Sequence, residues 1–113
     1  MKFISVYTYD PSAQSGPPDP KMPEKMGALI AELTASGQML DTGGIAPTGV
    51  SVRVQKNSGK TTVTDGPFTE SKEVVGGFAL FNVQSKDEVI ALTQRFLDLT
   101  GAGTCQLHEL AEM

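Results

Sequence analysis

The sequence has few of the residues that build disulfides and metal centres. Its 113 residues include one cysteine, Cys105, one histidine, His108, and no tryptophan. A single cysteine forms no disulfide within the chain, and one histidine with one cysteine falls short of the four ligands of a structural zinc site. No cofactor-binding motif is present either. We therefore expect no metal site and no cofactor.

The chain also lacks a basic excess and a long apolar run. Nine Lys and Arg stand against thirteen Asp and Glu, which gives a net charge of −4. Nucleic-acid binding normally rests on a basic footprint, and a membrane span needs about 20 apolar residues. The opening stretch MKFISVYTY is too short and too polar for a signal peptide. We expect a cytoplasmic protein that binds neither nucleic acid nor membrane.

The composition is that of a globular domain. Apolar residues make up 39% of the chain and charged residues 19%, which excludes a disordered chain. This length is that of one ordinary domain, and a chain of this size hides roughly 65% of its unfolded surface on folding. We expect a single domain over residues 1–113.

Hydrophobic periodicity predicts the order strand, helix, strand, hairpin, strand, helix, strand. A proline-rich loop over residues 10–23 precedes the first helix, which Gly37 ends. Ser85 and Glu88 form a capping box at the start of the second helix, and Gly101 ends it. The predicted strands cover 2–9, 38–42, 50–55, 61–64, 77–83 and 104–110. We expect Gly43-Gly44 to end the second strand. In the hairpin loop, Asn57 and Gly59 are able to adopt positive φ.

This order predicts a ferredoxin-like β-α-β-(β-hairpin)-β-α-β sandwich with an antiparallel sheet, an α+β fold whose helices cover one sheet face. The strands over 2–9 and 77–83 carry apolar residues on both faces. Large exposed apolar patches are rare on soluble monomers, so the uncovered face needs a partner. A second copy related by two-fold symmetry supplies one. We expect a homodimer whose sheets face each other and enclose a cavity.

The segment over residues 65–73, DGPFTESKE, concentrates ionisable groups beside a predicted turn. Asp65 could act as a general base if partly buried, and Lys72 could orient an anion or lower the pKa of a carboxyl. Alternatively, Asp65 caps its own turn and the other charges are solvated. Residue chemistry alone favours this structural interpretation.

DGPFTESKE resembles the DGPF-x-E-T-K-E signature of the DGPF proteins, which are related to the YCII domain, with Ser71 in place of Thr. PDPKMPEKMGALIAEL and VVGGF resemble further segments of that family, so the resemblance covers nearly the whole chain. It implies a dimeric α+β barrel. Many members are encoded beside extracytoplasmic-function sigma factors, which implies a signalling context and a possible sigma-factor partner.

The wider YCII group is thought to use a His–Asp pair, and here the sequence departs from it. Asp65 matches the loop aspartate, but the first half of the chain contains no histidine. His108, on the predicted last strand, is the remaining candidate partner. A lone histidine on a strand is more often structural than catalytic.

Further residues are candidates for ligand contact. Tyr7 could donate a hydrogen bond into a cleft, and the fork of Arg53 suits a carboxylate. In the alternative interpretation, the tyrosine hydroxyl lies at the rim and the arginine faces solvent. The full set of predicted ligand-binding residues is Tyr7, Arg53, Phe68, Glu70, Lys72 and Glu73.

Two functions from different classes fit these observations. The first is a dimeric module that binds or senses a small organic molecule, which needs only an enclosed pocket with a few polar anchors. The second is a cofactor-independent enzyme of the lyase, isomerase or oxygenase type, with Asp65 as base and Lys72, Arg53 or His108 as helper. The enzyme interpretation gains weight if Asp65 and a second titratable group line one concave pocket.

Overall fold

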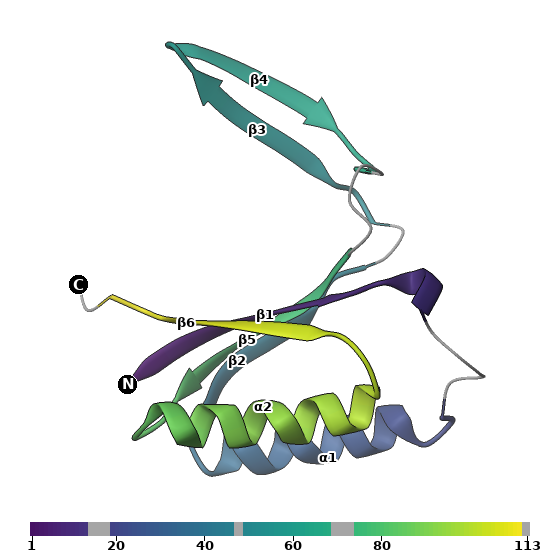
Figure 1. Ribbon diagram of the computed structural model, residues 1–113, viewed down its shortest axis with the longest axis vertical. Helices are drawn as coiled ribbons and strands as arrows, with labels where there is room; N and C mark the ends of the chain where they lie inside the picture. Colours follow the sequence, from purple (N-terminus) through teal and green to yellow (C-terminus); the bar gives the residue numbers. More distant parts are fainter. Residues whose placement is uncertain (14–18, 47–48, 69–73, 112–113) are drawn as a thin grey trace.

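A computed structural model of the chain describes residues 1–13, 19–46, 49–68 and 74–111. In the described chain, a four-stranded antiparallel sheet carries two helices on one face, and a separate hairpin projects from its opposite side (Figure 1). The elements are β1 (Lys2–Tyr9), a short 3-10 helix (Pro11–Ala13), α1 (Met22–Ala35), β2 (Met39–Gly44), β3 (Val52–Asn57), β4 (Lys60–Asp65), β5 (Val74–Asn82), α2 (Lys86–Thr100) and β6 (Thr104–Glu109).

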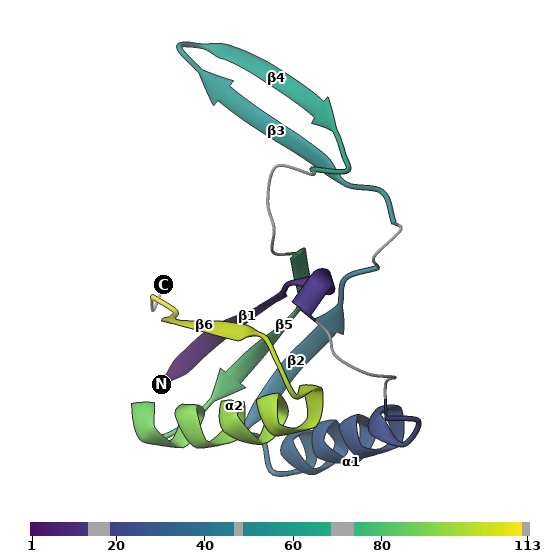
Figure 2. The same cartoon turned by 45° about the vertical axis from the view of Figure 1, so that its right-hand side comes forward.

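The sheet has the strand order β2-β5-β1-β6, and all three neighbouring pairs are antiparallel. With the β3–β4 hairpin set aside, this is the order of a ferredoxin-like fold, so the predicted fold class is confirmed. The hydrophobic strand β5 lies inside the sheet. Figure 2 shows that the hairpin forms its own two-stranded sheet away from the four-stranded one.

Local signals in the sequence fix the ends of both helices. Pro23 lies in the first turn of α1, where a missing N–H costs nothing, and Gly37 follows the helix with φ of 80°. At the start of α2, the Ser85 hydroxyl accepts a hydrogen bond from the Glu88 backbone N–H at 3.1 Å. Gly101, with φ of 78°, ends α2. The predicted ends at Gly37 and Gly101 and the cap by Ser85 are confirmed, whereas the Glu88 carboxylate accepts from the Gln84 backbone N–H and not from that of Ser85.

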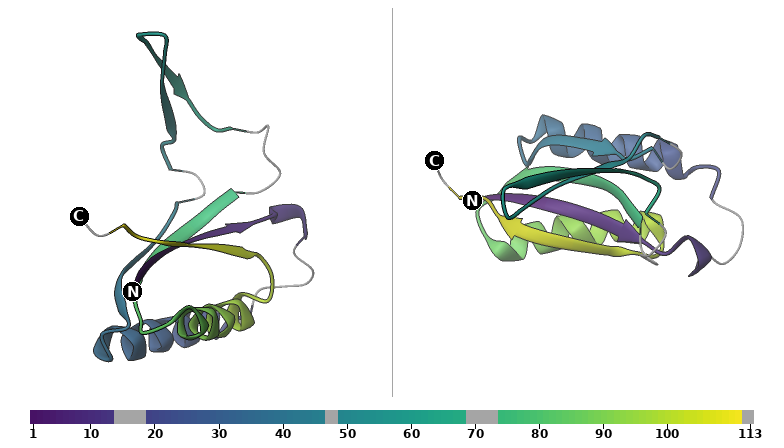
Figure 3. Two further views of the ribbon diagram at one scale, coloured as in Figure 1. Left: turned by 60° about the vertical axis from the view of Figure 1, so that its left-hand side comes forward. Right: turned by 90° about the horizontal axis from the view of Figure 1, so that it is seen from above.

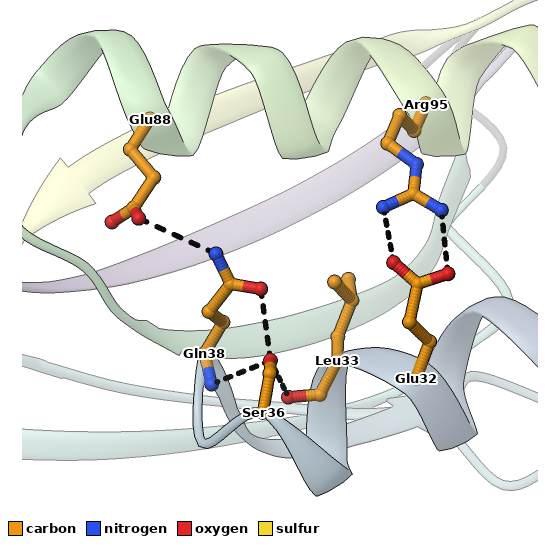
Figure 4. Close-up of polar contacts among 6 residues, drawn as sticks. All are labelled: Glu32, Leu33, Ser36, Gln38, Glu88 and Arg95. Atoms are coloured by element: carbon orange, nitrogen blue, oxygen red, sulfur yellow. Dashed lines mark hydrogen bonds and ion pairs between the residues drawn. The ribbon is translucent and has the colours of Figure 1, made fainter.

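The core lies between the helix layer and the sheet (Figure 3). Leu33 of α1 and Val89 of α2 are fully buried. Two polar links join the helical layer at its surface: Arg95 contacts Glu32 through both guanidinium nitrogens, and Gln38 donates to Glu88 (Figure 4). The buried apolar residues are Phe3, Leu29, Leu33, Met39, Phe81, Val83, Val89 and Leu92.

Three local predictions need correction. The positive φ angles in the hairpin turn belong to Ser58 and Gly59 rather than to Asn57. The strand β2 continues through Gly43 and Gly44, because these residues pair with β5. β5 begins at Val74, three residues before the predicted start. In both strands, ladder hydrogen bonds to a neighbour outweigh the weak strand propensity of glycine.

Candidate functional site

A cavity of about 660 Å³ lies between the helix layer and the sheet. This volume is within the range of small-molecule sites, roughly 300–1,000 Å³. The helices α1 and α2 supply one side, and the four strands of the large sheet supply the other. The lining residues on the helices include Met22, Met26, Ile30, Thr93 and Phe96; those on the sheet include Ser5, Tyr7, Thr42, Gly44, Gly77, Ala79 and Cys105.

None of the described residues that line the cavity has a charged side chain. Its polar side chains are hydroxyls and the Cys105 thiol, and several of the hydroxyls donate to backbone carbonyls. Thr42 donates to the carbonyl of Phe78 and Thr93 to that of Val89, each at 2.8 Å. Tyr7 donates to the carbonyl of Ala102, also at 2.8 Å. These hydroxyl oxygens therefore face a ligand as acceptors of hydrogen bonds.

The sheet side of the cavity has a patch without side chains. Gly44 of β2 pairs with Gly77 of β5, and Gly43 and Gly76 flank them. A Cβ atom added at Gly77 would lie 2.7 Å from the carbonyl oxygen of Gly43, so only glycine fits there. We name the four residues Gly43, Gly44, Gly76 and Gly77 the glycine floor. Aromatic rings cover part of it, because the Tyr7 and Tyr9 rings lie against Gly76 and the Phe78 ring lies against Gly43.

An aromatic wall closes one side of the cavity. The Tyr7 ring stacks on Tyr9, with centroids 5.8 Å apart, and meets Phe96 edge to face at 5.1 Å. A Cβ atom at Gly103 would lie 2.4 Å from the Tyr7 ring, so this glycine, with φ of 120°, lets the α2–β6 connection approach the tyrosine. These contacts hold the Tyr7 ring in one position.

Cys105 of β6 also lines the cavity. Burial raises the pKa of its thiol, and a hydrogen bond with Ser5 partly opposes that effect. The thiol is therefore mainly protonated at neutral pH and is a weak nucleophile. Cys105 acts as a neutral, polarisable part of the wall.

Of the predicted site residues, the structure places Tyr7 in the cavity and Asp65, Arg53, Phe68 and His108 elsewhere. Asp65 ends β4 and is exposed. The Arg53 guanidinium lies 4.1 Å from the centroid of the Phe68 ring, a cation–π contact at the base of the hairpin. His108 is exposed on β6 and pairs with Ile4.

The candidate pair Asp65 and His108 thus belongs to two different sheets. Neither residue lines the cavity. The remaining predicted contacts, Glu70, Lys72 and Glu73, lie outside the described residues. Within the described ranges, no three His, Cys, Asp or Glu side chains gather as a metal site would need, and no helix is long and apolar enough to cross a membrane.

Sequence reasoning missed most of the cavity lining. Met22, Met26, Leu29, Ile30 and Leu33 recur along α1 at the spacing typical of core residues, and all five line the cavity. The signal that could have found the site is the pair of double glycines, one in β2 and one in β5. Gly76-Gly77 marks a bulge and a close approach of backbones, because the register shifts opposite this pair, between Tyr7 and Thr8.

The family model of the YCII-related domain matches residues 1–108. The chain belongs to the YCII-related domain family. It is similar to a Rhizobium meliloti (strain 1021) protein of uncharacterised function, with 30% identity over 104 residues that cover 88% of this chain and 82% of the relative.

Among solved structures, the chain is similar to the 5-chloro-2-hydroxyhydroquinone dehydrochlorinase of Burkholderia phenoliruptrix AC1100, a complex with 2,5-dihydroxybenzoquinone. The TM-score is 0.51 and the identity 15%, and the match covers 100% of this chain and 96% of the other. At 15% sequence identity, the similarity between the two proteins shows a shared fold alone. It agrees with the α+β architecture described above.

Proposed function

We propose that this YCII-related domain binds a small, flat, uncharged organic molecule in the cavity between its helices and its sheet. The observation that carries the proposal is the cavity of about 660 Å³ whose described lining has no charged side chain. Burying an ionised ligand against such a lining costs several kcal/mol, because nothing there replaces the lost hydration. The site therefore favours neutral ligands over organic anions.

The shape and the hydrogen-bonding groups narrow the ligand class to phenols. The pair Gly44 and Gly77 adds no side chain to the sheet side of the cavity, and Met22 and Met26 supply adaptable side chains from α1. A planar ring fits between such surfaces. Because the Thr42 and Thr93 hydroxyls donate to backbone carbonyls, the ligand gains most by donating its own hydrogen bond to their oxygens. A phenolic O–H is such a donor.

The similar dehydrochlorinase supports only the planar shape of the ligand. Its solved structure is a complex with 2,5-dihydroxybenzoquinone, a planar ring whose hydroxyls are acidic, unlike those of a simple phenol. A ligand of that size and shape is compatible with the volume of the present cavity.

The test is isothermal titration calorimetry with two ligands of one ring system, 2-naphthol and 2-naphthoate. At pH 7 the first is neutral and donates a hydrogen bond, whereas the second is an anion. We expect 2-naphthol to bind at least tenfold more tightly, about 1.4 kcal/mol. Equal affinity for the two ligands, or tighter binding of the anion, would contradict the proposal.

A pair of alanine variants tests the location of the site. Ala79 lies on the cavity side of β5, so Ala79→Leu fills part of the cavity and should weaken 2-naphthol binding at least tenfold. Ala91→Leu makes the same change on the exposed surface of α2 and should leave the affinity unchanged. If both variants keep the wild-type dissociation constant, the ligand does not occupy this cavity.

The second candidate function is a cofactor-independent enzyme with Asp65 as base, and Lys72, Arg53 or His108 as helper. The observation in its favour is that the similar solved structure is a dehydrochlorinase. In this proposal Phe68, Glu70 and Glu73 stay predicted ligand contacts. Asp65→Asn separates the two candidates. It should abolish turnover of a small organic substrate if Asp65 is the base, and it should leave 2-naphthol binding unchanged if the protein only binds.

The proposal also includes the oligomeric state, the location and a partner of the protein. We infer a homodimer, because the sheet face opposite the helices carries apolar residues. A cytoplasmic location follows from the composition of the sequence and a signalling context with a sigma factor from its resemblance, and both stay predictions. Co-purification of a sigma factor with the full chain would support that context.

A further inference from the structure

The cavity is elongated, and its long axis runs along α1. The residues of α1 that line it extend from Met22 to Leu33, over about 16 Å of helix. On the opposite side, the lining of β5 extends from Gly76 to Phe81, over about 17 Å of strand. An apolar cavity of about 150 Å³ holds one benzene molecule, so a single ring leaves most of the 660 Å³ here unfilled.

The two ends of the cavity differ in exposure. Four core residues, none more than 8% exposed, line one end, which we call the closed end: Leu33, Met39, Phe81 and Leu92. The other end contains Pro23 of α1 and Gly44 of β2, which are exposed, and we call it the mouth. The strand register separates the two ends, because Phe81 pairs with Met39 whereas Gly77 pairs with Gly44. A ligand therefore enters at the mouth and reaches inward toward the core.

Polar contacts join the two helices near the closed end. The Gln38 side chain, just after α1, donates to Glu88 in the first turn of α2 at 3.3 Å. Arg95 of α2 contacts Glu32, the neighbour of Leu33 (Figure 4). These contacts hold α1 to α2 where the cavity ends, which keeps the closed end closed.

The sheet leaves less room for a ligand toward the closed end. On the cavity side of β5, the side chains increase in size from Gly77 through Ala79 to Phe81. Their partners in β2 follow the same order of size, from Gly44 through Thr42 to Met39. The wide part at the mouth therefore suits a ring, and the narrow part suits an unbranched chain.

Polarity also changes along this axis. Tyr7 pairs with Gly77 at the mouth, and the hydroxyls of Tyr7 and Thr100 both donate to the Ala102 carbonyl, at 2.8 and 2.9 Å. Both residues line the cavity, so their oxygens accept hydrogen bonds from a ligand there. The four side chains of the closed end are apolar. The cavity thus offers acceptors at its mouth and an apolar surface at its closed end.

We propose that the cavity binds a phenol with an unbranched alkyl chain, its ring beside Tyr7 and its chain in the closed end. The inference rests on the proposed function and adds the length and the direction of the ligand. In this orientation the phenolic O–H donates to the Tyr7 or Thr100 oxygen, and the chain passes over Ala79 toward Phe81. Burial of each methylene tightens binding about fourfold, so the affinity rises as long as the closed end has room for the chain.

Isothermal titration calorimetry of the full chain with four phenols tests the length of the ligand. The four are 4-ethylphenol, 4-butylphenol, 4-hexylphenol and 4-phenylphenol. We expect at least tenfold tighter binding for each pair of added methylenes up to 4-hexylphenol. We also expect 4-hexylphenol to bind more tightly than 4-phenylphenol, which carries the same number of carbons in a rigid ring. Equal affinities for the three alkylphenols, or tighter binding of 4-phenylphenol, would overturn the proposal.

A charge at the far end of the chain tests its direction. The ligand 6-(4-hydroxyphenyl)hexanoate differs from 4-hexylphenol in a carboxylate that replaces the last methyl group. In the closed end this carboxylate would lose its hydration, and none of the described lining residues is charged. We therefore expect binding weaker by about 100-fold or more. If the two ligands bind equally well, the chain points through the mouth into water, and the proposed orientation is wrong.

Two leucines of α2 provide matched variants. Leu92 lines the closed end, whereas Leu99 packs against the core and is not among the described residues that line the cavity. Leu92→Ala lengthens the closed end, so the gain in affinity from 4-hexylphenol to 4-octylphenol should be at least tenfold larger than in the wild type. Leu99→Ala should leave that gain unchanged. The same gain in all three proteins would mean that the chain lies elsewhere, which overturns the proposal.

Two controls keep the outcomes separate. Circular dichroism checks that each variant keeps its helices, and the wild-type titrations need no variant, so they decide even where Leu92→Ala does not fold. The second control is 2-naphthol, which has no chain. If 2-naphthol binds and a chain adds no affinity, the chain is wrong and the proposed function stands. If neither 2-naphthol nor any alkylphenol binds, both are wrong.

Discussion

The rings of Tyr7 and Phe96 meet edge to face, with centroids 5.1 Å apart and planes 86° apart. The contact joins the central strand β1 to α2, and both rings line the cavity. Edge-to-face pairs contribute about 0.5–1.5 kcal/mol beyond the burial of their area. The hydroxyl of Tyr7 adds a hydrogen bond to the Ala102 carbonyl in the connection between α2 and β6. One side chain therefore ties three segments together beside the ligand site.

The first prediction separates the two roles of this wall. Phe96→Ala removes one ring, enlarges the cavity and should lower the free energy of unfolding by about 2–3 kcal/mol, since Phe96 is only partly buried. Tyr7→Phe keeps the ring and loses an exposed hydrogen bond, so it should cost about 1 kcal/mol or less. Urea denaturation measures both changes. Equal losses in the two variants would show that the ring contact contributes little.

The second prediction concerns the glycine floor. Gly77→Ala brings a Cβ atom to 2.7 Å from the backbone oxygen of Gly43, which cannot move without shifting β2. We expect a loss of at least about 1 kcal/mol and weaker 2-naphthol binding. Gly44→Ala is the matched control across the ladder, because its Cβ atom meets its nearest neighbour, the Gly76 oxygen, at an ordinary 4.0 Å. If Gly44→Ala is the more damaging change, the floor does not depend on this close approach.

The fold was largely predictable because its signals are local. The Ser85 cap, the left-handed Gly37 and Gly101, and the aromatic and β-branched residues of β1 each act within a few residues. The strand β5 was predicted from its apolar run alone. Such signals set the order of elements, and right-handed crossovers then leave few arrangements of the sheet.

The site was less predictable because it forms between distant segments. The cavity joins Met26 of α1, Gly77 of β5 and Phe96 of α2, and no spacing along the chain links them. Asp65, in contrast, stood out in the sequence as part of a charged motif, and the structure places it on the exposed β3–β4 hairpin. A charged motif is visible locally, whereas an apolar pocket with glycines on its floor is visible only in three dimensions.

The third prediction uses a glycine inside a helix. A Cβ atom added at Gly27 in α1 meets nothing within 4 Å. Gly27→Ala should therefore raise the free energy of unfolding by up to about 1 kcal/mol, the difference in helix propensity between the two residues. Ala31→Gly, one turn later on the same exposed surface, should lower it by a similar amount. Thermal denaturation of both variants checks the sign. A loss of stability in Gly27→Ala would mean that the glycine has a packing role.

The fourth prediction is a dependence of stability on pH. The hydrogen bonds from Arg95 hold the pKa of the Glu32 carboxyl below its ordinary value in the folded protein. Because the pKa of Glu32 is lower in the folded protein than in the unfolded chain, the pair with Arg95 adds its full contribution to the free energy of unfolding above about pH 5. That contribution is lost as the pH falls through the lowered pKa. Glu32→Gln removes the titrating group. Its free energy of unfolding should fall less steeply than that of the wild type between about pH 5 and pH 3.

Arg95→Gln provides the reciprocal variant for this ion pair. It leaves the carboxyl of Glu32 without its partner, so the pKa of that carboxyl should return toward its ordinary value. The steeper acid dependence of the wild type should then disappear as it does in Glu32→Gln. Because both side chains are about half exposed, 0.5 M salt should weaken the effect. Unchanged acid slopes in both variants would show that the pair does not hold together in solution.

The last prediction uses Cys105 as a reporter of the cavity. Burial raises the pKa of its thiol, so less of it is thiolate at pH 8 than in an exposed cysteine. Alkylation by iodoacetamide should be at least tenfold slower in the folded protein than in the chain unfolded in urea. Ser5→Ala removes the hydrogen bond that favours the thiolate and should slow the folded reaction further. Saturating 2-naphthol should also slow it, since the ligand would lie against the same wall, whereas 2-naphthoate should not. If the folded and unfolded chains react at equal rates, Cys105 is open to solvent, and the wall it forms with Ser5 does not exclude water.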